Sequence, residues 1–360
     1  MRKRKRLLYV TFESFSSDPI LYSQCLPLLN CLDIFDSKYL LTTDDNSFSL
    51  EGAQSFNHIK TGGSISKIIT VLKLFRFLLG MVRVSDVVHV RGYILMPVIL
   101  MLRFFIPFKL IFDPRGLFLD EYYYKYNRKN MFFRVFQFLE PFFYKKSDVV
   151  IVVSNFFRDH VYKEYSVSSV VIPTFSKPPH SRLNILPSEW RDKVVLVYSG
   201  SLEKWQRFDD VIEIVRYLSR FDEFRFAFFS THTDTIRARL ANVIDPRKFF
   251  VECLPSDKLP NAFLECDYGF LLRNDLLLNR VSSPIKLKDY MAAGLISIVD
   301  CNVGDITHEN SQYFLDVNSD ELSEMLRRKN HSRPYIQNYF NDFFSLEVVV
   351  EKYKDVYEKL

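Results

Sequence analysis

Two cationic side chains in the second half of the chain, Arg273 and Lys286, are placed to stabilise a negatively charged group. Lys286 falls in the predicted first turn of a helix that Ser283 can cap and at whose start Pro284 is favoured. A helix N-terminus presents N–H groups without helical partners and the positive end of the helix dipole. The two cations and the helix start, from Ser283 to Ile285, therefore predict an anion-binding site.

A strand–helix–strand unit must position these groups. The apolar run Phe270–Leu272 predicts a buried strand that ends at Arg273, and a polar loop follows it. Apolar residues then recur at helical spacing through Met291, and Gly294 is typical of the residue that ends a helix. Ile296–Val299 predicts the next buried strand. An ordinary capped helix in an α/β domain would show the same pattern, so the prediction depends on further features.

A second anion-binding feature is predicted at Ser199, Gly200 and Ser201. The apolar run Lys193–Tyr198 predicts a buried strand, and Asp209–Ser219 predicts a helix. A turn of small residues between a strand and a helix directs backbone N–H groups at one point, and such a nest suits phosphate. No DxD pair follows a predicted strand, so we expect the negative charge to be stabilised without a metal.

In the first half of the chain, two predicted strands end in Arg-Gly. Arg91 follows one of them, and Arg115 and Gly116 follow the other. Each pattern places a guanidinium at the carboxyl edge of the sheet, where open α/β sheets bind ligands, and glycine lets the backbone approach a ligand closely. The alternative is a structural Arg115 that pairs with Asp120 or Glu121.

The composition is that of a folded protein with two domains. The chain has 360 residues, of which 48% are apolar and 25% charged. Residues 173–192 hold four prolines and no clear period, which predicts a connection between domains. Residues 1–180 carry 24 Lys and Arg against 15 Asp and Glu, a net charge of +9, and residues 181–360 carry 24 against 28, a net charge of −4. An anionic or membrane-borne partner is therefore expected at the N-terminal half.

Aromatic and basic residues are interleaved in the stretch Tyr122–Lys146. Rings and cations together suit a lipid headgroup interface, and they could also stack on and neutralise single-stranded nucleic acid. The predicted helix Ser64–Val84 is basic and amphipathic, and it suits either a membrane surface or a core with solvated lysines. The apolar run Ile94–Phe112 contains two prolines and two cations, so it predicts a buried helix and a strand, not a membrane span.

The cysteines argue against a disulfide framework or a zinc site. They form no CxxC pair and no ligand cluster with the histidines, so we expect reduced, buried thiols in a cytoplasmic protein. They are Cys25, Cys31, Cys253, Cys266 and Cys301.

Three segments resemble one family. SSPIKLKDYMAAGL, which ends at Leu295, is similar to the SPxKxxEYxAxG segment of the retaining, GT-B-type glycosyltransferases of family 4, especially those that build bacterial surface polysaccharides. IFDPRGLFLDE, which ends at Glu121, resembles their FDxRGxxxxE stretch. SDVVIVVSNFFRDHV, which ends at Val161, fits the end of their first domain.

The resemblance implies an α/β protein of the GT-B type, with two Rossmann-like domains facing each other across a cleft. Residues 1–175 would form an acceptor-binding domain, and residues 190–343 would form the nucleotide-sugar domain. The last helix, 344–360, would cross back and pack on the first domain.

The family pattern also assigns roles to single residues. By the resemblance, Asp289 holds the ribose of the donor, and its carboxylate can accept two hydrogen bonds from a hydroxyl pair. Leu254 would lie by the nucleobase. Arg115, Gly116 and Glu121 would face the cleft.

The sequence departs from the family pattern at three positions. Val281 stands where the family has a first glutamate, while Ser201 and Gln206 stand where it commonly has Arg and Lys on the pyrophosphate. Lys204 and Arg207 are the nearby cations that could take their place.

The implied reaction transfers a hexosyl group from a nucleoside diphosphate sugar to a growing, lipid-linked glycan, with retention and without a cofactor. The catalytic candidates are Arg115, Arg273 and Lys286. An inverting reaction would need a base, and carboxylates are available at the acceptor side. The acceptor-side candidates are Glu13, Asp18, Arg91, Gly116 and Glu121.

The expected partners are a nucleotide sugar, a glycan or lipid-linked oligosaccharide acceptor, and the inner face of the cytoplasmic membrane, with no nucleic acid. Two other functions stay open. A GT-B sugar-nucleotide epimerase would release free nucleotide without an acceptor. A non-enzymatic module would use the basic aromatic half to bind membranes or nucleic acid.

Overall fold

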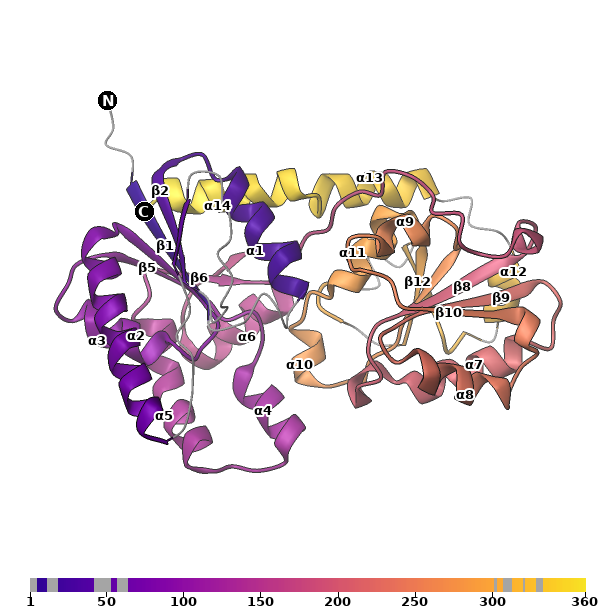
Figure 1. Cartoon of the computed structure of the whole chain (residues 1–360), viewed down its shortest axis with the longest axis horizontal. Coiled ribbons are helices and arrows are strands. Elements are labelled where there is room, and N and C mark those ends of the chain that lie inside the picture. Colours follow the sequence, from indigo (N-terminus) through magenta and orange to yellow (C-terminus); the bar gives the residue numbers. More distant parts are fainter. Residues whose placement is uncertain are drawn as a thin grey trace. The chain divides into compact units, whose positions relative to one another are not determined.

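The computed structural model describes residues 5–11, 19–41, 53–56, 64–300, 303–306, 313–319, 321–327 and 333–360. The chain forms two compact units (Figure 1). The N-terminal unit comprises Met1–Pro173 and Val350–Leu360, and the C-terminal unit comprises Thr174–Val349. The chain therefore passes from one unit to the other at the start of the proline-containing stretch. Glu13 and Asp18 lie outside the described residues.

The N-terminal unit is built on a parallel sheet with the strand order β3-β2-β1-β4-β5-β6-β7. Its strands are β1 (Lys5–Thr11), β2 (Phe35–Leu41), β3 (Ala53–Phe56), β4 (Val87–Arg91), β5 (Lys109–Asp113), β6 (Val149–Val152) and β7 (Val170–Val171). The central strands are nearly continuous apolar runs because helices cover both of their faces.

The helices of the N-terminal unit lie on both sides of this sheet (Figure 1). They are α1 (Pro19–Cys31), α2 (Ser64–Val84), α3 (Met96–Arg103), α4 (Phe118–Tyr126), α5 (Met131–Lys145), α6 (Asn155–Tyr165) and the end of α14 (Leu346–Glu358). The apolar run at 94–112 forms α3 and β5, as predicted. Among the described residues, no helix is both long and apolar enough to cross a bilayer.

Helix α2 packs as a core helix in the part whose side chains are described. Leu78, Met81 and Val82 are buried, while Arg76 and Arg83 are exposed. This half of α2 therefore supports a core helix with solvated cations, the second of the two explanations given by the sequence.

The C-terminal unit contains a second parallel sheet, with the order β10-β9-β8-β11-β12-β13. Its strands are β8 (Val194–Ser199), β9 (Phe224–Phe229), β10 (Phe249–Glu252), β11 (Tyr268–Leu271), β12 (Ile296–Val299) and β13 (Phe314–Asp316). Successive side chains of β8 point to opposite faces of the sheet and join two different cores. Leu196 and Tyr198 join one apolar cluster, and Val195 and Val197 join another.

Helices again lie on both sides of the C-terminal sheet (Figure 1). They are α7 (Phe208–Leu218), α8 (Thr233–Ala241), α9 (Leu259–Phe263), α10 (Leu277–Arg280), α11 (Ile285–Ala292), α12 (Leu322–Arg327) and α13 (Arg333–Phe343). Three short 3-10 helices are η1 (Ser188–Trp190), η2 (Lys204–Gln206) and η3 (Pro246–Lys248).

Two expectations about local structure were wrong. Ser283 does not cap α11, because Pro284 occupies the cap position and no side chain caps this helix. The cysteines are not all buried, since Cys31 and Cys253 are exposed whereas Cys25 and Cys266 are buried. Both exposed cysteines lie at the ends of elements. At such positions apolar neighbours in the sequence do not ensure that the side chain is buried.

Candidate active site

Most of the donor-side candidates lie at the point where the strand order of the C-terminal sheet reverses. Strands β8 and β11 are neighbours there, although α7, α8 and α9 separate them along the chain. Ser199 ends β8, and Arg273 follows β11, so both are at the carboxyl edge of the sheet. In open α/β sheets, ligands bind in the crevice outside this edge at such a switch point.

Gly200 makes the turn after β8 and lets a lysine approach the backbone. Its φ is +135°, a value that side chains rarely permit. A Cβ at this position would lie 3.0 Å from Nζ and 3.3 Å from Cε of Lys286. Glycine is therefore favoured by the backbone angle, and an added Cβ would displace the end of the Lys286 side chain by a few tenths of an ångström.

Lys286 lies in the first turn of α11, and its ammonium is held between two groups. Nζ donates a hydrogen bond to Oε1 of Gln206 at 3.0 Å and lies 4.5 Å from the centre of the Tyr198 ring. Burial lowers the pKa of Lys286 well below its usual range, the Arg273 guanidinium lowers it further, and Asp289 raises it. A bound anion would relieve this repulsion, since it would face both cations.

Arg273 is fixed by Asp300, because its backbone N–H donates to Oδ1 of that carboxylate at 3.1 Å. Asp300 also pairs with the Arg207 guanidinium, whose Nε donates to Oδ2 of Asp210 at 2.5 Å. Arg207 is thus engaged by two carboxylates and is a poor substitute for a pyrophosphate-binding Arg. Lys204, the other suggested substitute, is exposed on η2.

Ser283 connects the start of α11 to the beginning of the C-terminal unit. Its hydroxyl accepts from Nζ of the buried Lys288 at 2.9 Å and lies 3.1 Å from the Thr174 hydroxyl. Thr174 also donates to the carbonyl of Ser283 at 2.7 Å. The chain before Pro284 is therefore held rigidly, and the first N–H groups of α11, from Ile285, have no partner within the helix.

Asp289 lies one turn further along α11 than Lys286. The Ser176 hydroxyl donates to Oδ1 of Asp289. Burial raises the pKa of Asp289 to about 6, although Ser176, Lys288 and Lys286 each lower it. The carboxylate is ionised at neutral pH and has acceptor sites beyond the one that Ser176 uses.

Tyr290 is a residue of the site that the sequence did not identify. Its buried hydroxyl accepts the N–H of Ser199 at 3.2 Å and lies 3.5 Å from the carbonyls of Val197 and Phe270. A Cβ at Gly269 would overlap the Tyr290 ring, so the glycine makes room for it. Tyr290 therefore joins α11 to the end of β8, immediately before the Gly200 turn. The available signal was Gly269, a glycine inside a buried strand.

The two remaining donor-side candidates are placed without a distinctive contact to the cations. The Ser201 carbonyl accepts from the Tyr198 hydroxyl at 2.5 Å, which fixes the turn after Gly200. Leu254 follows β10 and is partly buried against the apolar cluster that contains Tyr290.

In the N-terminal unit, the candidate arginines gather around a buried carboxylate. Asp113 ends β5, and its Oδ2 lies 3.5 Å from Nη1 of Arg115 and 3.5 Å from Nε2 of His89. Arg91 is the register partner of Asp113 on β4 and is also buried. Burial raises the pKa of Asp113, but Arg115, His89 and Arg91 lower it more, so its pKa is below the usual value.

This cluster gives Arg115 a carboxylate partner that the sequence did not suggest. Arg115 pairs with Asp113, two residues before it in its own segment. It has a positive φ of 64°, which is uncommon for a residue with a side chain. The sharp turn before Gly116 thus returns the guanidinium to the strand end.

Gly116 and Glu121 lie against each other. A Cβ at Gly116 would be 2.4 Å from Oε1 of Glu121, so this glycine leaves room for the carboxylate. The Tyr93 hydroxyl donates to the carbonyl of Gly116 at 3.0 Å and lies 2.7 Å from the Tyr144 hydroxyl. The loop that carries Arg115 and Gly116 is therefore anchored to buried tyrosines.

His89 is the second residue that the sequence left without a role. Its Nδ1 lies 2.7 Å from the Tyr357 hydroxyl of α14, and its ring lies 4.5 Å from that of Tyr9. Burial lowers the pKa of His89 although Asp113 raises it. A neutral histidine thus links the last helix to the buried carboxylate at the end of β5.

Comparisons with known proteins agree with this architecture. Residues 58–175 match the sequence model of Glycosyltransferase Family 4. No curated protein sequence matches the chain. The structure is similar to a glycosyltransferase from Rickettsia africae ESF-5, with a TM-score of 0.69 and 14% identity over 99% of this chain and 98% of that one. The chain has the GT-B fold.

Other GT-B structures are equally similar. Alr3699/HepE of Anabaena, solved in complex with UDP and glucose, gives a TM-score of 0.70 at 12% identity, over 99% of this chain and 100% of that one. The lipopolysaccharide outer core galactosyltransferase WaaB gives 0.66 at 12% identity, over 99% and 100%. The TM-scores establish the fold, but sequence identities this low say nothing of the substrates. The substrates must be argued from the chemistry of the site.

Proposed function

We propose that this GT-B chain is a glycosyltransferase that moves a hexosyl group from a nucleoside diphosphate sugar to a glycan. The observation that carries the proposal is the placement of Lys286 and Arg273 beside the Gly200 turn, at the switch point of the C-terminal sheet. The family match over residues 58–175 and the fold support the same reaction class.

In the proposed reaction the bond between the anomeric carbon and the diphosphate oxygen breaks, an acceptor hydroxyl oxygen bonds to that carbon, and the hydroxyl proton is released with the nucleoside diphosphate. Negative charge grows on the leaving diphosphate, so preorganised cations stabilise the transition state more than the ground state. Lys286, Arg273 and the N–H groups at the start of α11 are the groups assigned to this role. We propose that these groups stabilise the leaving diphosphate without the help of a metal ion.

We further propose that the acceptor is a growing, lipid-linked glycan of bacterial surface polysaccharide synthesis and that the reaction proceeds with retention. HepE is described with UDP-glucose, and WaaB is named for transfer to lipopolysaccharide, which supports a nucleotide-sugar donor and a glycan acceptor. Arg91, at a strand end of the N-terminal unit, is the acceptor-side cation, and Arg115 at the next strand end is the catalytic candidate of the same unit. The anomeric configuration of the isolated product, measured by NMR, tests retention.

Thermal shift with sugar derivatives of UDP, GDP, ADP, CMP and dTDP, without added metal, tests donor binding. A ligand that binds the folded state raises the melting temperature by mass action. A shift with one base would identify the donor class and direct the choice of acceptors. Failure of every nucleotide sugar to shift the melting temperature would contradict the donor site.

Lys286→Ala tests the catalytic assignment. Because the variant removes a cation that faces the leaving group, we expect turnover to fall by at least about tenfold. The matched control is Arg216→Ala, which removes an exposed cation on α7 of the same unit. Equal turnover of Lys286→Ala and the wild type, with both folded, would exclude Lys286 from the reaction.

A peripheral position on the inner face of the cytoplasmic membrane completes the proposal. A lipid-linked acceptor would be restricted to that surface, and the described part of the chain has no spanning helix of its own. The interleaved rings and cations of the N-terminal half support this position.

A further inference from the structure

Helix α5 carries an apolar stripe that the described structure leaves exposed. Met131, Val135, Phe138 and Phe142 recur at helical spacing, and all of them are exposed. Met131 and Phe138 have 81% and 70% of their surface open to solvent. Isolated apolar residues on a surface need no explanation, but a continuous stripe along one helix marks a binding face.

The exposed stripe is not the core-facing side of α5. The opposite side of the helix carries Phe133, Phe136, Phe143 and Tyr144, all of which are buried. The helix is therefore apolar on two sides, and only one of them is needed for folding. A helix of a soluble domain normally has a polar side toward solvent.

The end of α3 extends the same face. Phe104 and Phe105 follow α3 with 88% and 77% of their surface exposed, and Met101 is also exposed. Arg103 connects this end to the end of α5, because its guanidinium donates to the Lys146 carbonyl and to Oδ2 of Asp148, the latter at 2.6 Å. Phe104, Phe105 and the α5 stripe (Met131, Val135, Phe138 and Phe142) together form the α3–α5 face.

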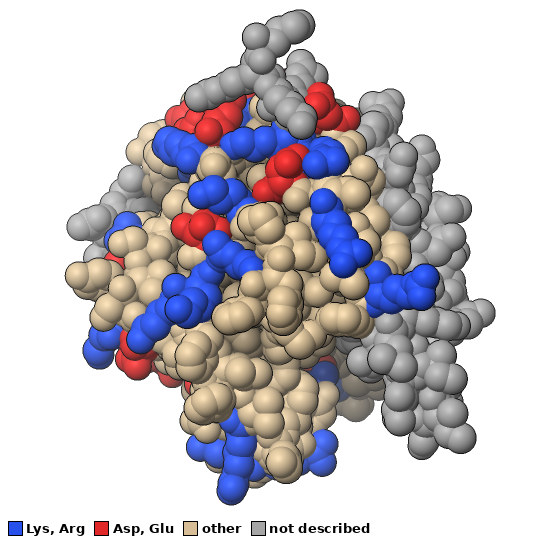
Figure 2. Space-filling view, turned by 90° about the vertical axis from the view of Figure 1, so that its left-hand side faces the viewer, with Lys and Arg blue, Asp and Glu red and all other residues tan. Residues whose placement is uncertain are grey.

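Cations outnumber carboxylates around the α3–α5 face. The exposed cations on and next to α5 are Lys125, Arg128, Lys129, Arg134, Lys145 and Lys146. The acidic residues of the same stretch are Asp120 and Glu121 on α4, the partly buried Glu140, and Asp148, which pairs with Arg103. Burial raises the pKa of Glu140 to about 7, which reduces its charge further. Figure 2 shows an uncharged area bordered mainly by Lys and Arg, with some Asp and Glu among them.

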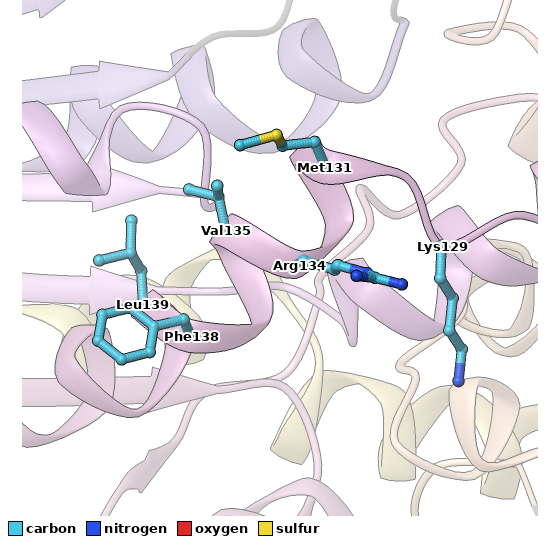
Figure 3. Close-up of a pocket in the computed structure, with 6 residues that line it drawn as sticks. All are labelled: Lys129, Met131, Arg134, Val135, Phe138 and Leu139. Carbon is cyan, nitrogen blue, oxygen red and sulfur yellow. The ribbon is translucent and has the colours of Figure 1, made fainter.

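A shallow hollow lies along the exposed side of α5 (Figure 3). It has a volume of about 470 Å³, and its lining combines apolar side chains with two cations. The lining residues are Lys129, Met131, Arg134, Val135, Phe138 and Leu139. Lys129 and Arg134 lie at one end of the hollow and Val135, Phe138 and Leu139 toward the other, which matches an anionic headgroup followed by an acyl chain (Figure 3).

We propose that the α3–α5 face docks on an anionic phospholipid bilayer, with its rings and Met131 in the headgroup–acyl boundary and its cations on lipid phosphates. This inference rests on the membrane position in the proposed function and names the surface responsible. A symmetric dimer through this face is disfavoured, because an isologous interface would bring the two cationic rims together. Phospholipid supplies the negative charge that a second copy lacks.

Vesicle sedimentation of the full chain tests this face. We expect binding to phosphatidylcholine vesicles in which phosphatidylglycerol makes up a third of the lipid, weaker binding to pure phosphatidylcholine, and weakening with salt. The double variant Met131→Ser and Phe138→Ser should lower the partition coefficient by on the order of tenfold, because two apolar side chains no longer enter the bilayer. The matched control is Tyr162→Ser, at an exposed ring on α6 of the same unit.

A second pair of variants separates charge from apolar contact. Lys145→Gln with Lys146→Gln should weaken binding to the anionic vesicles and reduce its salt dependence, with Arg216→Gln as the control on the other unit. A wild-type chain that stays in the supernatant but is stabilised by a nucleotide sugar would overturn the docking face and leave the donor proposal intact. Vesicle binding unchanged in the double variant, or a dimer in solution that the double variant abolishes, would also overturn it.

Discussion

At the scale of single residues, the donor site depends on how close Lys286 lies to the backbone. Its ammonium lies next to Gly200 and over the face of the Tyr198 ring, and it is repelled by the Arg273 guanidinium. The sequence predicted Lys286, Arg273 and Gly200 as members of one anion site, and the structure places them together. It could not predict that Arg207 was already paired on both sides, because Asp300, one of its two carboxylate partners, follows β12 and is far from Arg207 in the sequence.

Gly200→Ala tests this proximity. An Ala must adopt a φ of +135° and bring Cβ within 3.0 Å of the lysine nitrogen, so the lysine has to move. We expect donor affinity, measured by titration calorimetry, to fall by about tenfold as a cation contact is lost. We also expect the free energy of unfolding to decrease by about 1–2 kcal/mol through backbone strain.

The matched control is Gly80→Ala in α2, where an added Cβ meets nothing within 4 Å. In a helix this change should increase the free energy of unfolding by about 0.5–1 kcal/mol and leave donor affinity unchanged. Donor affinity that is equal in Gly200→Ala and Gly80→Ala would show that the turn does not position Lys286.

At the scale of elements, apolar periodicity was sufficient to predict the strands and helices of the switch point. It predicted β11, α11 and β12 in order, since buried strands are short apolar runs and α11 has one apolar side. It failed for Ser283, whose partner Thr174 is 109 residues away in the sequence. Polar partners brought together by topology leave no local periodic signal.

Tyr290 was missed for a related reason, because a tyrosine on the buried side of a helix resembles any core residue. Tyr290→Phe tests whether it is a positioning residue. The ring keeps its place beside Gly269, but the buried N–H of Ser199 loses its acceptor, which costs about 1–3 kcal/mol of unfolding free energy.

If Tyr290 also positions the Gly200 turn, the KM for the donor should rise in Tyr290→Phe more than kcat falls. A variant that is less stable but has an unchanged KM would leave Tyr290 with a purely structural role.

At the scale of the whole molecule, the last helix returns to the unit in which the chain began. Val350–Leu360 belong to the N-terminal unit, where Tyr353 and Tyr357 are buried and Lys354 lies 3.1 Å from Asp33. The family resemblance implied a terminal helix of this kind, whereas periodicity indicates only that the helix is amphipathic. Its specific contact, between Tyr357 and His89, joins residues 268 positions apart and could not be inferred from either.

Tyr357→Phe tests whether this contact holds the N-terminal unit together. Removing the hydroxyl leaves Nδ1 of the buried His89 without its described partner, so the free energy of unfolding should fall by about 1–3 kcal/mol in chemical denaturation. Tyr162→Phe, at an exposed tyrosine, is the control and should change it by less than about 0.5 kcal/mol. The loss should be largest above the pKa of a free histidine, about 6.5, where His89 is neutral in both folded and unfolded states.

Acidification should itself destabilise the unit through His89. Its folded pKa is below the unfolded value, so its contribution to stability is present above about 6.5 and is lost as the pH falls through the folded pKa. His89 lies beside Asp113, which pairs with Arg115, so the same contact connects the terminal helix to a catalytic candidate. Equal stability of Tyr357→Phe and Tyr162→Phe at neutral pH would mean that the terminal helix is held by its apolar packing alone.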